Sequence, residues 1–180
     1  MPELRIIGGT WRSRRLKFPA VPGLRPTPDR ARETLFNWLG QDLSNRDCLD
    51  LFAGSGALGF EAASRGARVV LMVERDRRIV TALNASAAVL GAGQVRIVQA
   101  DVLEFICAPQ QKFDVAFLDP PYQSDFSSRT LRALPRLLRP NALVYCEAAD
   151  QIDVPLAFER LRQRRYGQVW LTLLRFNGER

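Results

Sequence analysis

Between residues 47 and 147, short apolar runs alternate with stretches whose apolar residues recur at helical spacing. The apolar runs are four to six residues long, which is typical of buried strands. In the stretch 77–90, Ile79, Leu83 and Leu90 fall on one face of a helix. Strands that alternate with helices predict a parallel sheet covered on both faces. The predicted strands are 48–52, 68–73, 95–98, 113–118 and 142–146. The predicted helices are 57–65, 77–90, 101–107 and one that includes 130–138.

The two ends of the chain depart from this alternation. At the C-terminus, the runs 158–166 and 168–176 meet at Gly167 and predict an antiparallel hairpin. At the N-terminus, the runs 4–8 and 16–18 predict a second, smaller hairpin. We therefore expect an α/β fold whose seven-stranded, mostly parallel sheet ends in a C-terminal antiparallel hairpin.

A proline-rich loop separates the N-terminal hairpin from the next predicted element. Thr27 and Pro28 are typical of a helix start, so we expect Thr27 to cap a helix with Pro28 at its first position. Gly40 predicts the end of that helix. Residues 1–40 then form a small basic extension of hairpin and helix, and residues 41–180 form the α/β domain.

Composition limits the chemistry that this chain can perform. Its 180 residues, 47% hydrophobic and 25% charged, fit one globular domain with a full core. It has no run of 18 apolar residues and no apolar signal segment at its start, so we expect a cytoplasmic protein without a membrane partner. The absence of histidine excludes catalytic triads and bases built on that residue. Cys48, Cys107 and Cys146 are too widely spaced for a zinc motif, so we expect no metal.

The basic residues are nearly all arginine and lie mainly at the two ends. Arginine accounts for 24 of 26 basic residues, residues 1–32 have net charge +6, and residues 128–180 have +5. Arginine suits bidentate phosphate contacts, so the flanks predict a nucleic-acid partner. Solvated arginines that reflect a GC-rich genome are the alternative. Arg12, Arg14 and Arg15, near the tip of the N-terminal hairpin, are the candidate contacts.

The run Gly54-Ser55-Gly56-Ala57-Leu58-Gly59 is a literal G-x-G-x-x-G between a predicted strand and a predicted helix. Its glycines allow close approach of a ligand to the backbone and to the positive end of the helix. Glu74 lies 20 residues after the first glycine, where a carboxylate accepts hydrogen bonds from ribose hydroxyls. This pattern alone is typical of a nicotinamide or flavin dinucleotide site, and a tight turn without a ligand also fits it.

Three more carboxylates follow predicted strands and change the expected cofactor. Asp50 lies near the end of the first strand, Asp101 follows the third and Asp119 follows the fourth. Carboxylates at these strand ends, together with Glu74, repel a pyrophosphate but suit the ammonium, ribose and adenine of S-adenosylmethionine. Helix caps or loop turns are the alternative for Asp50 and Asp101.

The sequence Asp119-Pro120-Pro121-Tyr122 is the most specific signal in the chain. The two prolines end the strand and fix the backbone. The Asp119 carboxylate and the Pro120 carbonyl then offer two acceptors, and Tyr122 offers a flat ring. This arrangement fits a planar group that carries an NH₂, and it resembles the (D/N)-P-P-(Y/F) motif of amino-group methyltransferases. A proline-terminated strand with a packed tyrosine is the structural alternative.

The region 47–147 resembles the Rossmann-like class I methyltransferases that use S-adenosylmethionine. The runs 8–16, 25–27 and 32–37 are more particular and resemble the RsmD family, which methylates the N2 amino group of one guanine in 16S small-subunit ribosomal RNA. The resemblance covers nearly the whole chain. It departs from the family at Ser13, where a glycine is expected.

The resemblance implies a cofactor site, a catalytic site and a set of substrate-binding residues. For Arg32 and Asn37, which belong to the last set, a solvated helix face is the alternative. The implied cofactor site is Asp50, Phe52, Gly54, Ser55, Gly56, Glu74, Asp101, Val102 and Asp119. The implied catalytic site around the target base is Asp119, Pro120, Pro121 and Tyr122, with Arg25, Thr27, Arg32 and Asn37 beside it.

The expected reaction is direct methyl transfer to the guanine amino nitrogen, which requires no histidine. The expected partner is ribosomal RNA in an assembling 30S particle, and the expected oligomeric state is a monomer. The motif does not separate guanine N2 from adenine N6 in DNA or RNA, or from a glutamine amide, although the basic flanks disfavour a peptide. An NAD-linked oxidoreductase and a non-catalytic RNA-binding protein are the alternatives from other classes.

Overall fold

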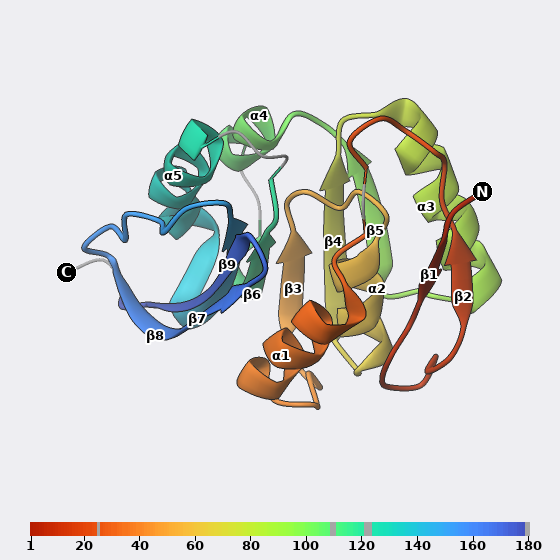
Figure 1. Cartoon of the computed structure of the whole chain (residues 1–180), viewed down its shortest axis with the longest axis horizontal. Coiled ribbons are helices and arrows are strands. Elements are labelled where there is room, and N and C mark those ends of the chain that lie inside the picture. Colours follow the sequence, from red (N-terminus) through yellow and green to blue (C-terminus); the bar gives the residue numbers. More distant parts are fainter. Residues whose placement is uncertain (25, 109–110, 121–123, 179–180) are drawn as a thin grey trace.

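The computed structural model describes residues 1–24, 26–108, 111–120 and 124–178, with the backbone alone for Ser124 and Asp125. The strands of its large sheet are β3 (Asp47–Asp50), β4 (Val69–Glu74), β5 (Val95–Gln99), β6 (Phe113–Leu118), β7 (Leu138–Ala148), β8 (Phe158–Tyr166) and β9 (Val169–Phe176). They are ordered β5-β4-β3-β6-β7-β9-β8 (Figure 1). The first five are parallel, and β9 and β8 form an antiparallel hairpin at the edge. The predicted seven-stranded, mostly parallel sheet is confirmed.

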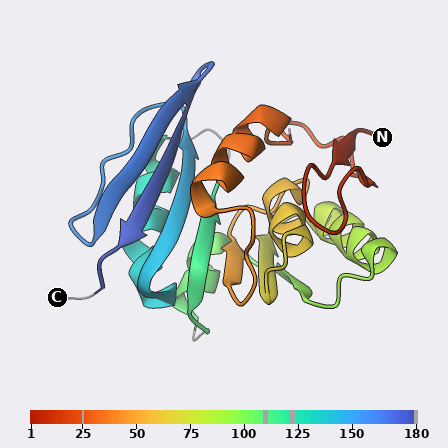
Figure 2. The same cartoon turned by 90° about the horizontal axis from the view of Figure 1, so that it is seen from below.

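Helices cover both faces of the sheet (Figure 2). Side chains alternate along each strand, so Cys48 and Val115 face one core cluster while Leu49 and Ala116 face the other. The first cluster is completed by the helices α1 (Asp29–Leu39), α2 (Ala57–Ser64) and α3 (Arg77–Leu90), and the second by α4 (Val102–Cys107), α5 (Ser124–Ala133) and the 3₁₀ helix η1 (Leu134–Leu137). No helix in the described ranges is both long and apolar enough to cross a membrane.

The boundary between α5 and β7 differs from the prediction of a helix through residue 138. The α-helix ends at Ala133, and η1 carries the chain from there to β7. Pro135 explains the change because proline has no N–H to extend the α-helical hydrogen bonds. β7 also begins earlier than predicted, and its first part is irregular, with Asn141 at φ 64°.

The predicted N-terminal hairpin is present as β1 (Glu3–Arg5) and β2 (Arg15–Lys17), with shorter strands than expected. Its tip packs against the end of α2, where the backbone N–H of Thr10 donates to the Ser64 carbonyl over 2.7 Å. Ser13 in this tip has φ 69°, a left-handed conformation that favours glycine. This conformation gives a physical reason why a glycine is expected at that position.

The predicted helix cap is wrong in its details. α1 begins at Asp29 after Pro28, and no side chain in the described part of the chain caps it. The Thr27 hydroxyl instead donates a hydrogen bond to Asp119 Oδ2 over 3.2 Å. The segment between β2 and α1 crosses the edge of the sheet where the parallel strands end (Figure 1). The N-terminal segment therefore reaches the edge that carries the candidate chemistry.

Candidate active site

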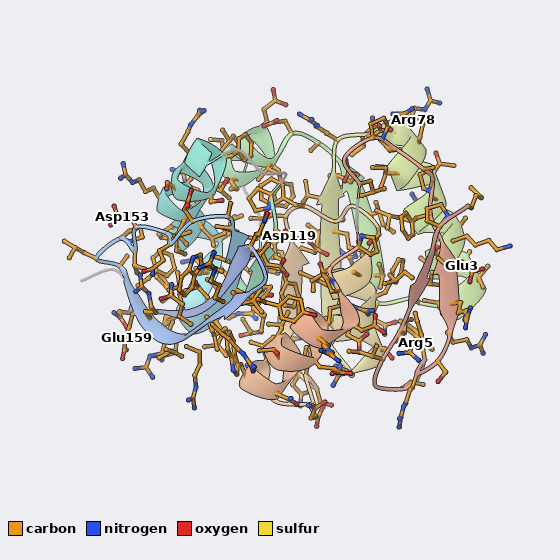
Figure 3. The ribbon with its side chains drawn as sticks, in the orientation of Figure 1. Glu3, Arg5, Arg78, Asp119, Asp153 and Glu159 are labelled. Carbon is orange, nitrogen blue, oxygen red and sulfur yellow. The ribbon has the colours of Figure 1, made fainter. Side chains whose placement is uncertain are left out.

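Carboxylates gather at the carboxyl ends of four neighbouring parallel strands. Asp50 ends β3, Glu74 ends β4, Asp119 directly follows β6, and Glu147 lies near the end of β7. Figure 3 labels Asp119 at this edge. Within the described ranges, no group of three or more His, Cys, Asp or Glu residues is arranged to hold a metal ion. The edge is where open parallel sheets bind ligands.

Asp50 is almost fully buried, at 1% exposure. Its Oδ2 accepts a hydrogen bond from the backbone N–H of Gly59 over 3.0 Å, while Oδ1 is buried without a partner among the described residues. Burial raises the pKa of Asp50 to about 7, and the nearby charge of Asp119 adds to the effect. A buried acceptor without a donor is costly, so the site fits a ligand that brings a positive N–H group.

The glycine loop and Glu74 are in contact, as their spacing suggested. Gly54 and Gly56 have φ of 50° and 83°, the left-handed region that favours glycine. Glu74 Oε2 accepts from the backbone N–H of Gly54 over 3.1 Å, and Oε1 accepts from that of Asp76 over 2.8 Å. These bonds fix the Glu74 carboxylate beside the loop. Ser55 is buried in the same loop.

Other members of the predicted cofactor site have structural roles. Asp101 caps α4 because its Oδ1 accepts from the backbone N–H groups of Leu103 and Glu104, over 2.9 and 3.3 Å. The helix cap given above as the alternative is therefore present, and a ligand contact stays a prediction. Val102 is buried in the core, and the ring of Phe52 packs edge-on against Phe126 with centroids 5.7 Å apart.

Asp119 is paired across strands with a glutamate that sequence reasoning missed. Phe117 pairs with Tyr145 in the register of β6 and β7, which places Asp119 level with Glu147. Burial raises the pKa of Asp119 to about 6. The hydrogen bond from Thr27 acts in the opposite direction and lowers this pKa, but its effect is smaller. Burial and the charge of Asp119 raise the pKa of Glu147 to about 8. Two acceptors thus lie side by side.

A tyrosine holds this second carboxylate in place. The Tyr145 hydroxyl donates to Glu147 Oε1 over 2.7 Å, and Tyr145 is fully buried. Glu147 directly follows the predicted strand 142–146, so the rule that singled out Asp50 and Asp119 could have found it. Of the other predicted residues around the target base, Pro120 is buried, and Arg25, Pro121 and Tyr122 lie outside the described residues.

Arg32 is fully buried. It therefore does not lie on a solvated helix face, and its side chain is not placed to touch a substrate, so both expectations for this residue are wrong. Its Nε donates to the Thr27 carbonyl over 3.2 Å and its Nη1 to Glu61 Oε2 over 3.1 Å. Its Nη2 donates to the Arg5 carbonyl over 2.8 Å and to Asp29 Oδ1 over 2.5 Å. Arg32 therefore positions the backbone of Thr27, whose hydroxyl binds Asp119.

Glu61 is the buried anion at the centre of this network. It also pairs with Arg65 over 2.9 Å and accepts from the backbone N–H of Ile7 over 3.0 Å. Since Arg32 lies on α1 and Glu61 on α2, the network ties the hairpin and both helices together.

The remaining predicted substrate residues lie away from Asp119. Asn37 lies on α1, ten residues after Thr27, and its side chain is exposed. Its Oδ1 accepts a hydrogen bond from Gln41 Nε2 over 2.5 Å. Arg12 and Arg14 are exposed at the tip of the hairpin that contacts Ser64, at the opposite end of α2 from the glycine loop. Arg15 pairs with Glu3 over 3.3 Å. Contacts of these residues with a nucleic acid stay predictions.

The sheet order and the acidic strand ends define a Rossmann-like fold of the class I methyltransferase type. At 19% identity, an RNA methyltransferase structure from Salinibacter ruber shares this fold with a TM-score of 0.70, over 87% of this chain and 96% of that one. Residues 4–175 match the family described as Conserved hypothetical protein 95, and the chain belongs to that family.

Two relatives and one solved structure each match most of the length of this chain. It is 41% identical over 172 residues to Ribosomal RNA small subunit methyltransferase D of Escherichia coli K12, covering 93% of this chain and 87% of the relative. The protein of the same name from Haemophilus influenzae is 42% identical over 160 residues, covering 86% and 82%. The structure of yhhF from Escherichia coli has a TM-score of 0.91 at 39% identity, covering 99% of this chain and all of that one.

The Arg32–Glu61 pair yields a stability prediction. We expect Arg32→Met to lower the free energy of unfolding by about 3–5 kcal/mol, because it leaves a buried carboxylate short of a partner. Urea denaturation measures this change. Arg30→Met, at an exposed position of the same helix, should stay within about 0.5 kcal/mol of the wild type. Equal stability of the two variants would contradict the account.

The raised pKa values of Asp50, Asp119 and Glu147 yield a pH prediction. The folded state binds more protons than the unfolded state, so stability should fall as pH rises from about 4 to about 8. Glu147→Gln keeps an acceptor for Tyr145 but does not ionise. We expect this variant to have a larger free energy of unfolding than the wild type at pH 8.5. The difference between the two proteins should be smaller at pH 5.5. Urea titrations at both pH values measure these free energies, and Glu104→Gln, at an exposed position, is the control. An equal increase in stability of Glu147→Gln at both pH values would refute the prediction.

Proposed function

We propose that this protein transfers a methyl group from S-adenosylmethionine to the exocyclic N2 amino group of a guanine in small-subunit ribosomal RNA. The observation that carries the proposal is the adjacent pair of carboxyl groups, half-buried Asp119 and buried Glu147, at the carboxyl edge of a methyltransferase-type sheet. The names of the relatives that match most of the chain support methylation of small-subunit ribosomal RNA.

The residues around the glycine loop fit the cofactor. Oδ1 of Asp50, which has no donor among the described residues, would accept from the ammonium of the methionine part. Glu74, fixed beside Gly54, would accept from the ribose hydroxyls. When bound, S-adenosylmethionine supplies an electrophilic methyl group on its sulfonium. The acidic edge disfavours a pyrophosphate and therefore an NAD-linked oxidoreductase.

Asp119 and Glu147 together favour guanine over adenine. The Watson–Crick edge of guanine presents the N1–H and N2–H donors side by side, so Glu147 would accept from N1–H and Asp119 from N2–H. Guanine N1–H would bind and stabilise the ionised form of Glu147, whereas the adenine N1 acceptor cannot pair with that carboxylate. Tyr145 holds one Glu147 oxygen and so orients the side chain for this contact.

Asp119 would also assist the transfer step. The lone pair of the guanine N2 is delocalised into the ring, which makes the nitrogen a weak nucleophile. A hydrogen bond from N2–H to Asp119 stabilises the positive charge that develops as the nitrogen attacks. Thr27, held by Arg32, donates to Asp119 Oδ2 and fixes the orientation of the carboxylate. The second acceptor at Pro120 and stacking on Tyr122 belong to the same proposal.

We further propose that the substrate is ribosomal RNA within an assembling 30S particle and that the enzyme acts as a monomer in the cytoplasm. The basic flanks of the chain support an RNA partner. Arg12, Arg14 and Arg15 lie away from Asp119, so they would contact RNA beyond the target nucleotide.

The first prediction from this proposal concerns Asp119. We expect Asp119→Ala to lower the methyl-transfer rate by a factor of roughly 10²–10³, the usual effect of losing one preorganised electrostatic partner. Affinity for S-adenosylhomocysteine should change little. Single-turnover transfer of labelled methyl groups to small ribosomal particles measures the rate, and calorimetry measures the affinity. Full activity of the variant would show that Asp119 has no catalytic role.

The second prediction concerns recognition of the base by Glu147. We expect the wild type to methylate guanine faster than 2-aminopurine at the target position, because 2-aminopurine keeps the amino group but has no N1–H. Glu147→Gln should lower this preference by roughly tenfold or more, since the amide can donate to the 2-aminopurine N1.

Competition between the two RNAs for one enzyme measures the ratio of kcat/KM values directly. Tyr145→Phe serves as a milder variant, since it keeps the Glu147 carboxylate and removes only its hydrogen bond. If Glu147→Gln retains the wild-type preference, Glu147 does not read the base.

A further inference from the structure

The edge strand β8 carries a group of arginines that the site described above does not use. Its nine residues, Phe158–Tyr166, include four arginines and one acid, Glu159. Glu159 is already paired with Arg175 over 2.5 Å. The strand therefore presents strong positive charge at the margin of the sheet.

The four arginines divide between the two faces of the sheet. On one face, the Arg165 guanidinium lies 5.9 Å from the centroid of the Trp170 ring and its Nε donates to the Gly167 carbonyl over 3.2 Å, while Arg160 donates to the Ile152 carbonyl over 3.2 Å. These two arginines are used within the protein and brace the hairpin.

Arg162 and Arg164 lie on the opposite face. They pair in register with Leu173 and Leu171, which belong to the core cluster beneath α1. Tyr166 follows on the same face, so side chains at alternate positions line it. Arg162 and Arg164 are exposed, and among the described side chains no carboxylate pairs with either. Two arginines are thus directed toward solvent on the face that also carries α1.

The register places this face next to the candidate active site. Ala148 at the end of β7 pairs with Trp170, and Tyr166 pairs with Val169, so the turn at Gly167 lies just beyond the strand end that carries Glu147. In Figure 2 the β8–β9 hairpin extends past the rest of the sheet on the side of α1. Arg164 is level with Glu147 because both pair with Leu171. Tyr166 lies one step of about 6.6 Å beyond that level, and Arg162 lies one such step before it.

We infer that Arg162, Arg164 and Tyr166, here called the β8 track, bind the backbone of the substrate RNA beside the target nucleotide. The inference rests on the proposed function and adds the surface that guides RNA to Asp119. Arginine forks bind phosphates in bidentate fashion, and a tyrosine ring stacks on an unpaired base. The N-terminal hairpin, with Arg12 and Arg14 at its tip, contacts Ser64 at the opposite end of α2 from the glycine loop.

A second role for such arginines has to be separated from RNA binding. Charged side chains on an edge strand also prevent pairing with the edge of another molecule. That role predicts aggregation when the charges are removed, with RNA affinity per folded molecule unchanged.

The test compares two double variants that lose the same charge. Arg162→Gln/Arg164→Gln alters the β8 track, and Arg96→Gln/Arg136→Gln removes two exposed arginines from β5, the other edge strand, and from η1. Affinity for a small-subunit ribosomal RNA fragment is measured from 50 to 300 mM salt with S-adenosylhomocysteine present. Light scattering monitors aggregation, and methyl transfer gives kcat and KM.

We expect the track variant to bind RNA at least roughly tenfold more weakly and to lose about 0.7–0.9 of salt slope for each phosphate contact removed. Its KM for RNA should rise, with kcat at saturating RNA and affinity for S-adenosylhomocysteine retained. The control variant should match the wild type.

Wild-type RNA affinity in the track variant overturns the inference, as does an equal loss in both variants or aggregation alone. Because binding is measured without transfer, a wild type that binds RNA but methylates none refutes the proposed function and still tests the track.

Discussion

The buried ion pair between Arg32 and Glu61 holds together parts of the chain that are far apart in sequence. Burying two charges is costly unless every donor and acceptor is satisfied, and here the Arg32 side chain makes four hydrogen bonds. Glu61 binds a second arginine and a backbone N–H of the N-terminal hairpin. The result is a fixed position for Thr27 at the strand edge, which in turn orients Asp119. A contact deep in the core thereby sets the geometry of the candidate site.

The acidic edge of the sheet is costly to the ligand-free fold. Burial raises the pKa values of Asp50, Asp119 and Glu147, which means that their charged forms are disfavoured where they stand. A ligand that brings N–H donors or positive charge to the edge removes part of this cost. Preorganised acceptors that wait for donors are what methyl transfer to an amino group requires, so the same residues that reduce stability support the proposed reaction.

The sequence predicted the sheet and the acidic strand ends well, because alternating patterns and strand ends are local features. The residue pattern predicts Thr27 as a helix cap and the family resemblance places it beside the catalytic site, but only the fold shows its hydrogen bond to Asp119, 92 positions away. The resemblance places Arg32 beside the substrate and a solvated helix face is the alternative, because periodicity does not reveal a buried ion pair. Glu147 directly follows a predicted strand, as Asp119 does, so its place at the strand edge was within reach of the same rule. Long-range contacts between polar groups were thus the part that pattern reasoning could not supply.

The central claim is that this acidic edge directs a methyl group to the N2 of guanine in small-subunit ribosomal RNA. Its most direct test is to incubate the protein with labelled S-adenosylmethionine and small ribosomal particles from cells that lack the enzyme, and then to analyse the nucleosides. The account predicts that the label appears in N2-methylguanosine. Label in N6-methyladenosine, or no transfer to RNA at all, would contradict it.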